Sequence, residues 1–215
     1  KEMGDTFYVT IYNADGVAVS NAKEDSVRAY VARAYGSQKA TGKTMMVDML
    51  NYGAAAQVHF NYGTDDLANN QLTDAQKATG TATAPEMSND QVKGTNYNGT
   101  RFILESRIQV QLAFKNMTSD MYAIYTYTDA AGKEQTVRVE GTDFVIIGGK
   151  PAGVELSALV YADARALVEV TVYNADGTVY GSATDSIESC CVRSGGDLFV
   201  ALMKFADSAK KHLFG

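Results

Sequence analysis

The sequence contains no tryptophan, and only two cysteines, two histidines and two prolines among its 215 residues. The cysteines, Cys190 and Cys191, are adjacent. A disulfide between neighbours is strained, because a bridge normally needs Cα atoms roughly 4.4–6.8 Å apart. The chain therefore has no disulfide framework. Two histidines, His59 and His212, leave little material for acid–base or metal chemistry, so we expect no enzymatic activity, no cofactor and no metal site.

Long apolar runs and basic clusters are also missing. No run approaches the roughly 18–20 apolar residues of a membrane-spanning helix, so we expect no membrane insertion by this segment. The net charge is −6, and Asp207 interrupts the densest basic stretch, residues 204–211. Nucleic-acid binding needs a basic surface that neutralises phosphates, so no nucleic-acid partner is expected. The chain starts at Lys1 without a signal-like stretch, so an export signal or anchor is expected outside it.

An internal repeat is the clearest feature that is present. The string YNADG occurs at residues 12–16 and again at 173–177, inside a longer match of residues 7–33 with residues 167–193. After a one-residue gap, Ser26 corresponds to Ser186 and Arg33 to Arg193. The match resumes between residues 47–60 and 200–213, where His59 corresponds to His212. We interpret this pattern as a duplication of about 55 residues.

Each copy is predicted to contain a β-hairpin, a short helix and a longer helix. The sequence Asn-Ala-Asp-Gly favours a type I turn closed by glycine in the left-handed region, as in a three-residue hairpin loop. The alternative, a calcium loop, lacks the glutamate that such loops place at position 12. Asp25 and Asp185 are predicted to cap the short helices.

The segment between the copies has two parts. Residues 64–91 are polar and irregular, with one short helix expected near residues 72–78. Short runs rich in β-branched and aromatic residues follow, separated by turn residues, and are predicted to be strands; they cover residues 101–106, 107–115, 120–129, 134–141, 142–149 and 153–160. This spacing indicates an antiparallel sandwich.

The fold prediction is therefore α+β, a central antiparallel β-sandwich flanked by two duplicated hairpin–helix–helix elements. The expected divisions are the first element at 1–63, a polar linker at 64–91, the sandwich at 92–166 and the second element at 167–215. The terminal hairpins are expected to extend the sheets of the sandwich. We expect a monomer.

Several strings resemble a recurring module of large secreted and cell-surface proteins from Gram-positive gut anaerobes. They are MLNYGAAAQVHFNY (residues 49–62), YAIYTYTDAAGKEQTVRV (122–139) and VTVYNADGTVYGSATDSIES (170–189). The resemblance covers nearly the whole chain except residues 64–91. It implies an extracellular, surface-attached protein, and some carriers belong to polysaccharide-adherence assemblies. This sequence departs from the module at Cys190–Cys191, where a Tyr-Val or similar pair is common.

Tyrosines next to amides are the main candidates for ligand binding, because sugar rings stack on aromatic faces and amides bond their hydroxyls. Alternation along residues 122–128 places Tyr125 and Tyr127 on one face and Tyr122 on the other, and either face is allowed to point outward. If Ile124 faces the core, Tyr125 and Tyr127 are expected to form an exposed ladder, and these two residues are the first candidates. The other candidates are Tyr122, Tyr97, Asn96 and Asn98. Ordinary packing within the sheet is the alternative for all of these tyrosines.

The cysteines and histidines have structural explanations beside the chemical ones. Cys190 is a candidate nucleophile only with a histidine base nearby, and two small core residues on a helix are the alternative. His59 and His212 either converge on a ligand or pack at helix ends. From these patterns we predict a noncatalytic extracellular binding and adhesion module that binds polysaccharide, specifically a glucan, at a bacterial cell surface. The alternative is a structural or protein–protein interaction module of a multidomain surface protein.

Overall fold

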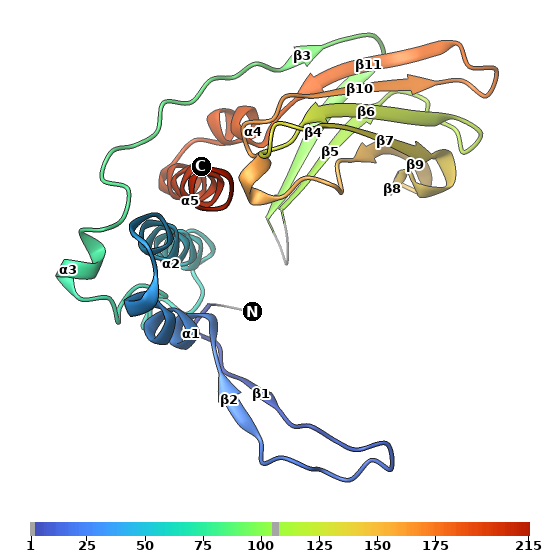
Figure 1. The fold of residues 1–215 in the computed structure, drawn as a ribbon. Helices are drawn as coiled ribbons and strands as arrows, with labels where there is room; N and C mark the ends of the chain where they lie inside the picture. The colour runs from blue at the N-terminus through green and yellow to red at the C-terminus, as the bar shows by residue number, and fades with distance from the viewer. Residues whose placement is uncertain (1–2, 105–107) are drawn as a thin grey trace. The chain divides into compact units, whose positions relative to one another are not determined.

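The computed structural model describes residues 3–104 and 108–215 (Figure 1). The chain divides into two compact units, residues 1–84 and residues 85–215. This division differs from the four parts expected from the sequence: residues 64–84 join the first unit, and the sandwich and the second element share the other. The described part is α+β, with two antiparallel sheets packed together and five α-helices, as the sequence predicted at this level.

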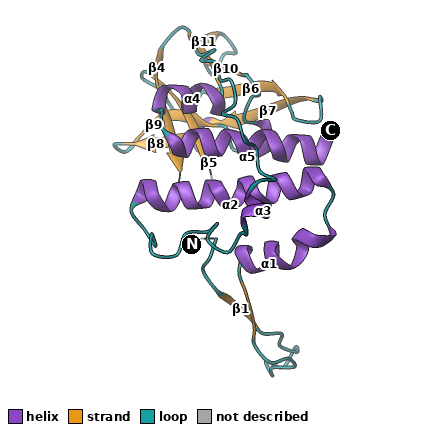
Figure 2. Ribbon diagram, turned by 90° about the vertical axis from the view of Figure 1, so that its left-hand side faces the viewer, coloured by secondary structure: helices purple, strands orange, loops and turns teal. Residues whose placement is uncertain are grey.

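The first unit contains a two-stranded ribbon and three helices. Strand β1 (Phe7–Val9) pairs antiparallel with β2 (Lys23–Asp25). The helices are α1 (Val27–Ala34), α2 (Ala40–Phe60) and α3 (Asp74–Lys77), with a short 3₁₀ turn, η1 (Tyr35–Ser37), between the first two. Helices α1 and α2 lie side by side (Figures 1 and 2) and share a small apolar core. Its buried members are Val31, Met46, Val47, Leu50, Ala68 and Leu72.

Residues 64–81, expected to be part of a polar linker, are built into this unit. The buried side chain of Gln57 accepts a hydrogen bond from the Ala68 amide over 2.7 Å and donates to the carbonyls of Gly63 and Asp66. Buried Asp48 accepts from the amide and hydroxyl of Thr81. These contacts satisfy the irregular backbone and hold Ala68 in the core, a result that the polar composition did not predict.

The second unit contains nine strands in two sheets within its described residues. The five-stranded sheet has the order β3 (Val92–Lys93), β11 (Val179–Asp185), β10 (Val168–Tyr173), β6 (Tyr122–Thr128) and β7 (Glu134–Glu140). The four-stranded sheet has the order β4 (Tyr97–Leu104), β5 (Ile108–Phe114), β9 (Lys150–Glu155) and β8 (Val145–Ile147). Each predicted strand between residues 101 and 160 overlaps an observed strand, but β8 and β9 cover only part of the last two predictions, because residues 142–144 and 156–160 are not strand. Residues 105–107 lie outside the described part.

Alternating side chains from both sheets fill the core of this unit. Ala123, Tyr125, Val168 and Val170 come from the five-stranded sheet, and Val110, Leu112, Phe114 and Val154 from the other; all are buried. Helices α4 (Ile187–Ser194) and α5 (Asp197–Phe214) lie at one end of the sheets (Figure 1). Two 3₁₀ turns, η2 (Gly141–Asp143) and η3 (Tyr161–Asp163), complete the unit.

The two hairpins have the same turn and different surroundings. In both, the glycine of NADG has positive φ (76° at Gly16, 83° at Gly177) and donates to the carbonyl of the asparagine three residues earlier. The hairpin-turn prediction is therefore confirmed. Strands β10 and β11 extend the five-stranded sheet, as expected, whereas β1 and β2 form a separate ribbon.

The short helices α1 and α4 begin in the same way. Ser26 and Ser186 are the N-caps, with nearly equal backbone angles, and each hydroxyl accepts from the amide three residues on. The predicted aspartate caps are therefore wrong by one residue. Asp25 and Asp185 instead accept a hydrogen bond from the serine amide itself. None of the described helices is long and apolar enough to cross a membrane.

Candidate functional site

The proposed ladder of Tyr125 and Tyr127 lies on the inner face of the five-stranded sheet. Tyr125 has no exposed surface and Tyr127 is 8% exposed. Their hydroxyls contact the Ala158 backbone: the amide donates to Tyr125 over 3.2 Å, and Tyr127 donates to the carbonyl over 3.4 Å. The expectation of an exposed ladder is wrong. Sequence alternation allowed either parity, and packing against the second sheet selected the buried one.

Tyr122 lies on the outer face of the same sheet, but its ring is already covered. It stacks on Tyr173 of β10, with ring centroids 5.0 Å apart and planes 12° apart. The Arg138 guanidinium of β7 lies 3.6 Å from the Tyr122 ring centroid. Because β10 and β7 flank β6 on opposite sides, both faces of this ring are occupied. Tyr122 therefore offers no free platform for a sugar.

The remaining three candidates are consecutive, and two of them line a surface depression. Asn96, with φ of 56°, donates from its side chain to the Tyr180 carbonyl over 2.7 Å and shapes the turn before β4. Tyr97 is half-buried, and Asn98 is exposed. The depression has a volume of about 480 Å³ and is bordered by Gln91, Lys93, Tyr97, Asn98, Gly99, Thr100, Lys115 and Arg193.

The depression is polar and carries positive charge. Lys93 and Lys115 form no ion pair with any residue in the described ranges, whereas Arg193 is paired. The Tyr97 hydroxyl bonds Gln91 and Thr100, each over 2.8 Å, and burial raises the Tyr97 pKa. Ammonium groups, an exposed amide and a tyrosine edge suit a hydroxylated or anionic ligand.

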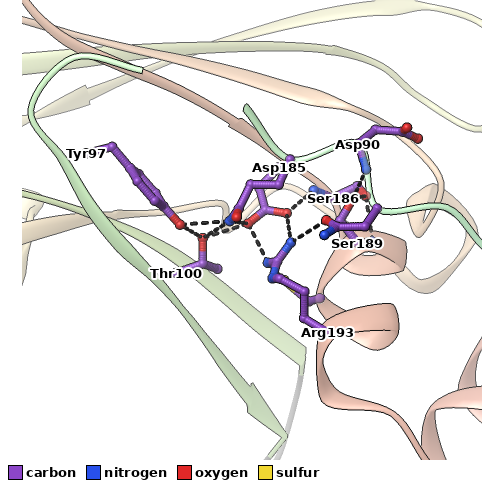
Figure 3. Close-up of polar contacts among 10 residues, drawn as sticks. Asp90, Tyr97, Thr100, Asp185, Ser186, Ser189 and Arg193 are labelled. Atoms are coloured by element: carbon purple, nitrogen blue, oxygen red, sulfur yellow. Dashed lines mark hydrogen bonds and ion pairs between the residues drawn. The ribbon is translucent and has the colours of Figure 1, made fainter. Parts of the chain in front are cut away.

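A buried carboxylate, Asp185, lies between Thr100 and Arg193, two residues that border the depression (Figure 3). Located at the end of β11, it accepts from Thr100 over 2.6 Å and from Gln91 over 2.8 Å. Arg193 of α4 donates to both of its oxygens, over 3.1 and 2.7 Å. With its oxygens all engaged, Asp185 has the environment of a structural anion rather than of a catalytic base.

The segment before β3 runs along this network as a polar strap, defined here as residues 86–91. The Asp90 amide donates to the Ser189 hydroxyl and the Ser88 amide to Glu188, both residues of α4. The Asn89 side chain accepts from Arg193, and the Glu86 carbonyl accepts from Arg165. Arg165 also pairs with Glu188 and, through two contacts, with Asp207 of α5.

Sequence reasoning missed the Asp185–Arg193 pair and the strap. The signal was nevertheless present, because each copy of the repeat carries aspartate, serine and, eight residues after the aspartate, arginine. In the first copy, Arg33 also pairs with Asp25, through one contact of 2.5 Å to a single carboxylate oxygen. The hydrogen bond from Arg33 is the main cause that lowers the pKa of Asp25. The strap itself has no sequence pattern and was included in the predicted linker.

The two cysteines are buried core residues of α4. Burial raises the pKa of each thiol from its ordinary value of 9.0 to about 12. A thiol with such a pKa stays protonated at neutral pH and is a poor nucleophile. Arg193 donates to the Cys190 sulfur over 3.2 Å, which fixes the position of the thiol without activating it.

The histidines lie near helix ends, and side chains of the NADG turns bond within their own loops. His59 lies in α2 beside Phe60, with ring centroids 4.9 Å apart, and His212 lies in the last turn of α5. Among residues 3–104 and 108–215, no group of three or more His, Cys, Asp or Glu side chains is placed to hold a metal ion. In the turns, the Asn13 and Asp176 side chains accept from nearby backbone amides of the same loop.

The candidate site is thus a cationic depression that includes Tyr97, next to the buried Asp185 carboxylate, whose hydrogen-bond partners are all within the protein. Comparison of the chain with protein-family models, with curated proteins and with solved structures gives no match.

Proposed function

We propose that this chain is a noncatalytic protein-interaction module of a multidomain, extracellular surface protein. The observation that supports this function best is the exposure of apolar residues in the β1–β2 ribbon. They occupy positions that, in the β10–β11 hairpin, belong to the core. The resemblance of the LNYGAAAQ segment to modules of surface proteins supports the location.

The proposal includes the duplication inferred from the sequence, and the geometry of the two elements supports it. The pairing registers agree: Phe7 faces Asp25 and Val9 faces Lys23, while Val168 faces Asp185 and Val170 faces Ala183. The turns, the serine caps and the aspartate–arginine pairs also correspond. Two unrelated hairpin–helix segments have no physical reason to share all of these details.

Exposure separates the two elements. Phe7, Val9 and Ile11 are 41%, 51% and 60% exposed, whereas their counterparts Val168, Val170 and Val172 are 0%, 1% and 0% exposed. In α1, Val27 and Tyr30 are 39% and 57% exposed, and both of their counterparts in α4 are buried. An exposed apolar surface with free strand edges marks a site for association with another protein.

A substitution pair tests this function. We expect Val9→Lys with Ile11→Lys to abolish retention of a specific surface protein by the immobilised chain, because two ammonium groups oppose burial. Val179→Lys, at an equally exposed apolar position of β11, is the matched control and should retain that protein. Equal retention by the ribbon variant, the control and the unsubstituted chain would rule out the ribbon as the interaction surface.

A second candidate function is polysaccharide binding, and the depression at Tyr97 favours it. Its lysines favour a polysaccharide that carries carboxylates or sulfates over a neutral glucan. Affinity electrophoresis through gels containing polygalacturonate or a neutral glucan tests this function. We expect polygalacturonate alone to slow the chain, and Lys93→Ala with Lys115→Ala to remove the shift. If neither polygalacturonate nor the neutral glucan slows the chain, polysaccharide binding is eliminated as a candidate function.

A further inference from the structure

We infer that the β1–β2 ribbon and α1 dock on an antiparallel β-sandwich of the same type as residues 85–166, supplied by another part of the assembly. This inference rests on the proposed interaction function and names the class of partner. It follows from the way in which the second element, β10–β11–α4, is completed inside this chain.

The free edge of β1 is the first part of the docking surface. The corresponding strand, β10, pairs antiparallel with β6, where Val170 faces Tyr125 and Val172 faces Ala123. Strand β1 has β2 as its only ladder partner among the described strands, so its other edge is open. An open edge with apolar side chains is suited to strand addition, in which main-chain hydrogen bonds supply affinity and side chains supply specificity.

The side chains of the ribbon match this mode of docking. The Val168, Val170 and Val172 side chains point into the sandwich, and Phe7, Val9 and Ile11 share their alternation. Tyr12 corresponds to Tyr173, which stacks on Tyr122 of β6. The partner is therefore expected to present a strand that carries alternating core residues and an outward aromatic residue, as β6 does.

Helix α1 supplies the second part of the surface. Ile187 and Cys190 of α4 are each 1% exposed in the second unit, and Val27 and Tyr30 occupy the corresponding positions of α1. A single strand added to the edge would leave these two residues in water. Their exposure beside β2 indicates that the partner reaches over the helix, as β4 and the polar strap do in the second unit.

The ion pair of the first element supplies the third part. Asp185 and Arg193 are covered by Thr100, Gln91 and Asn89, which bond them. Asp25 and Arg33 make the same ion pair, with side chains 29% and 60% exposed. A partner with a polar strap can bond these groups, so that burying the pair leaves no polar atom unsatisfied.

The probe that tests the inference is an additional copy of residues 85–166, joined by a flexible Gly/Ser linker ahead of residue 1 of the full chain. The linker gives the two parts a high effective concentration. We expect backbone amides of residues 7–12 to exchange hydrogen at least about tenfold more slowly than in the chain without the addition. Val9→Lys in the tandem chain should restore fast exchange, and Val179→Lys should not.

Three results would overturn the inference. One is unchanged exchange of residues 7–12 in the tandem chain, whether or not the added sandwich is folded. Another is slow exchange of these amides already in the chain without the addition, which would mean that the ribbon is covered from within. The third is that Val9→Lys and Val179→Lys speed the exchange of residues 7–12 in the tandem chain to the same extent. These results leave the interaction function standing if, in the retention assay, the Val9→Lys, Ile11→Lys variant fails to retain the surface protein that the unsubstituted chain retains. In that case only the class of partner is rejected.

Discussion

Arg193 donates hydrogen bonds to both carboxylate oxygens of Asp185, and the Asp185 side chain has no exposed surface. Arg33 and Asp25 form the corresponding ion pair in the first unit, through a single contact to one carboxylate oxygen, and both side chains reach solvent. The same short motif therefore occurs in two different dielectric surroundings. A carboxylate out of water depends far more on its partner than one in water, because nothing else offsets the lost hydration.

The first prediction compares these two aspartates. Asp185→Asn leaves Arg193 without its counter-charge and should lower the free energy of unfolding by roughly 2–4 kcal/mol, below the range for a fully buried pair because Arg193 is partly exposed. Asp25→Asn is the matched control and should cost clearly less, since its pair is solvated. Urea denaturation measures both. If both variants lose the same free energy of unfolding, the difference in burial between Asp185 and Asp25 is contradicted.

The second prediction concerns the thiols of Cys190 and Cys191. Iodoacetamide should leave both unmodified in the native protein at pH 8 and modify both in guanidinium chloride, because burial raises their pKa to about 12. Mass spectrometry of the intact chain measures this. Modification of the native chain at the rate of the unfolded one would show that these thiols are accessible.

The same shift predicts a pH dependence of stability. Each folded-state thiol pKa lies above the ordinary value of 9.0, so the unfolded chain releases these protons first as the pH rises. The free energy of unfolding should therefore be unaffected by these groups below about pH 8 and should fall as the pH rises above 9.0. Cys190→Ala with Cys191→Ala should reduce that fall. A slope identical to that of the unsubstituted chain would contradict the assignment.

The third prediction separates the two faces of β6. Tyr125→Ala removes a wholly buried ring and should cost about 3–5 kcal/mol. Tyr122→Ala removes a stacked ring from the outer face and should cost about 1 kcal/mol. Thermal and urea denaturation compare the two variants. A larger loss at Tyr122 would mean that the faces of the sheet are assigned the wrong way round.

The fourth prediction concerns the loop that follows α2. Gln57→Ala removes three hydrogen bonds made by a buried side chain and should cost about 1–3 kcal/mol, while the Ala68 amide exchanges hydrogen faster. Gln71→Ala, at an exposed position of the same segment, is the control and should change neither quantity. Unchanged exchange at Ala68 in the Gln57 variant would argue against its role in holding the segment.

Local features of the fold were predictable because they depend on a few neighbouring residues. The NADG turns need only glycine with positive φ and a short side chain that bonds the loop, and both hairpins formed as expected. The strands of the sandwich followed from β-branched and aromatic runs between turns. The helix caps were missed by one residue, since Ser26 and the aspartate before it both prefer that position.

The candidate site was harder to predict, because exposure is decided by what packs on each face. Alternation placed Tyr125 and Tyr127 together, but it did not state which face meets the second sheet. The Asp185 network joins side chains from β4, β11, α4 and the strap. Some of these residues, such as Gln91 and Asp185, are far apart in the sequence. No local pattern encodes such a convergence.

The sequence by itself determined the repeat, its turns and the alternation of its strands, since these depend on residue order and on interactions within a few residues. Only the tertiary structure decided that the two copies of the repeat have different surroundings. Val170 lies against a strand from elsewhere in the chain and is buried, while Val9, at the matching position, remains exposed. The physical reason is that burial depends on a long-range partner, and similar local sequences do not specify whether such a partner is present.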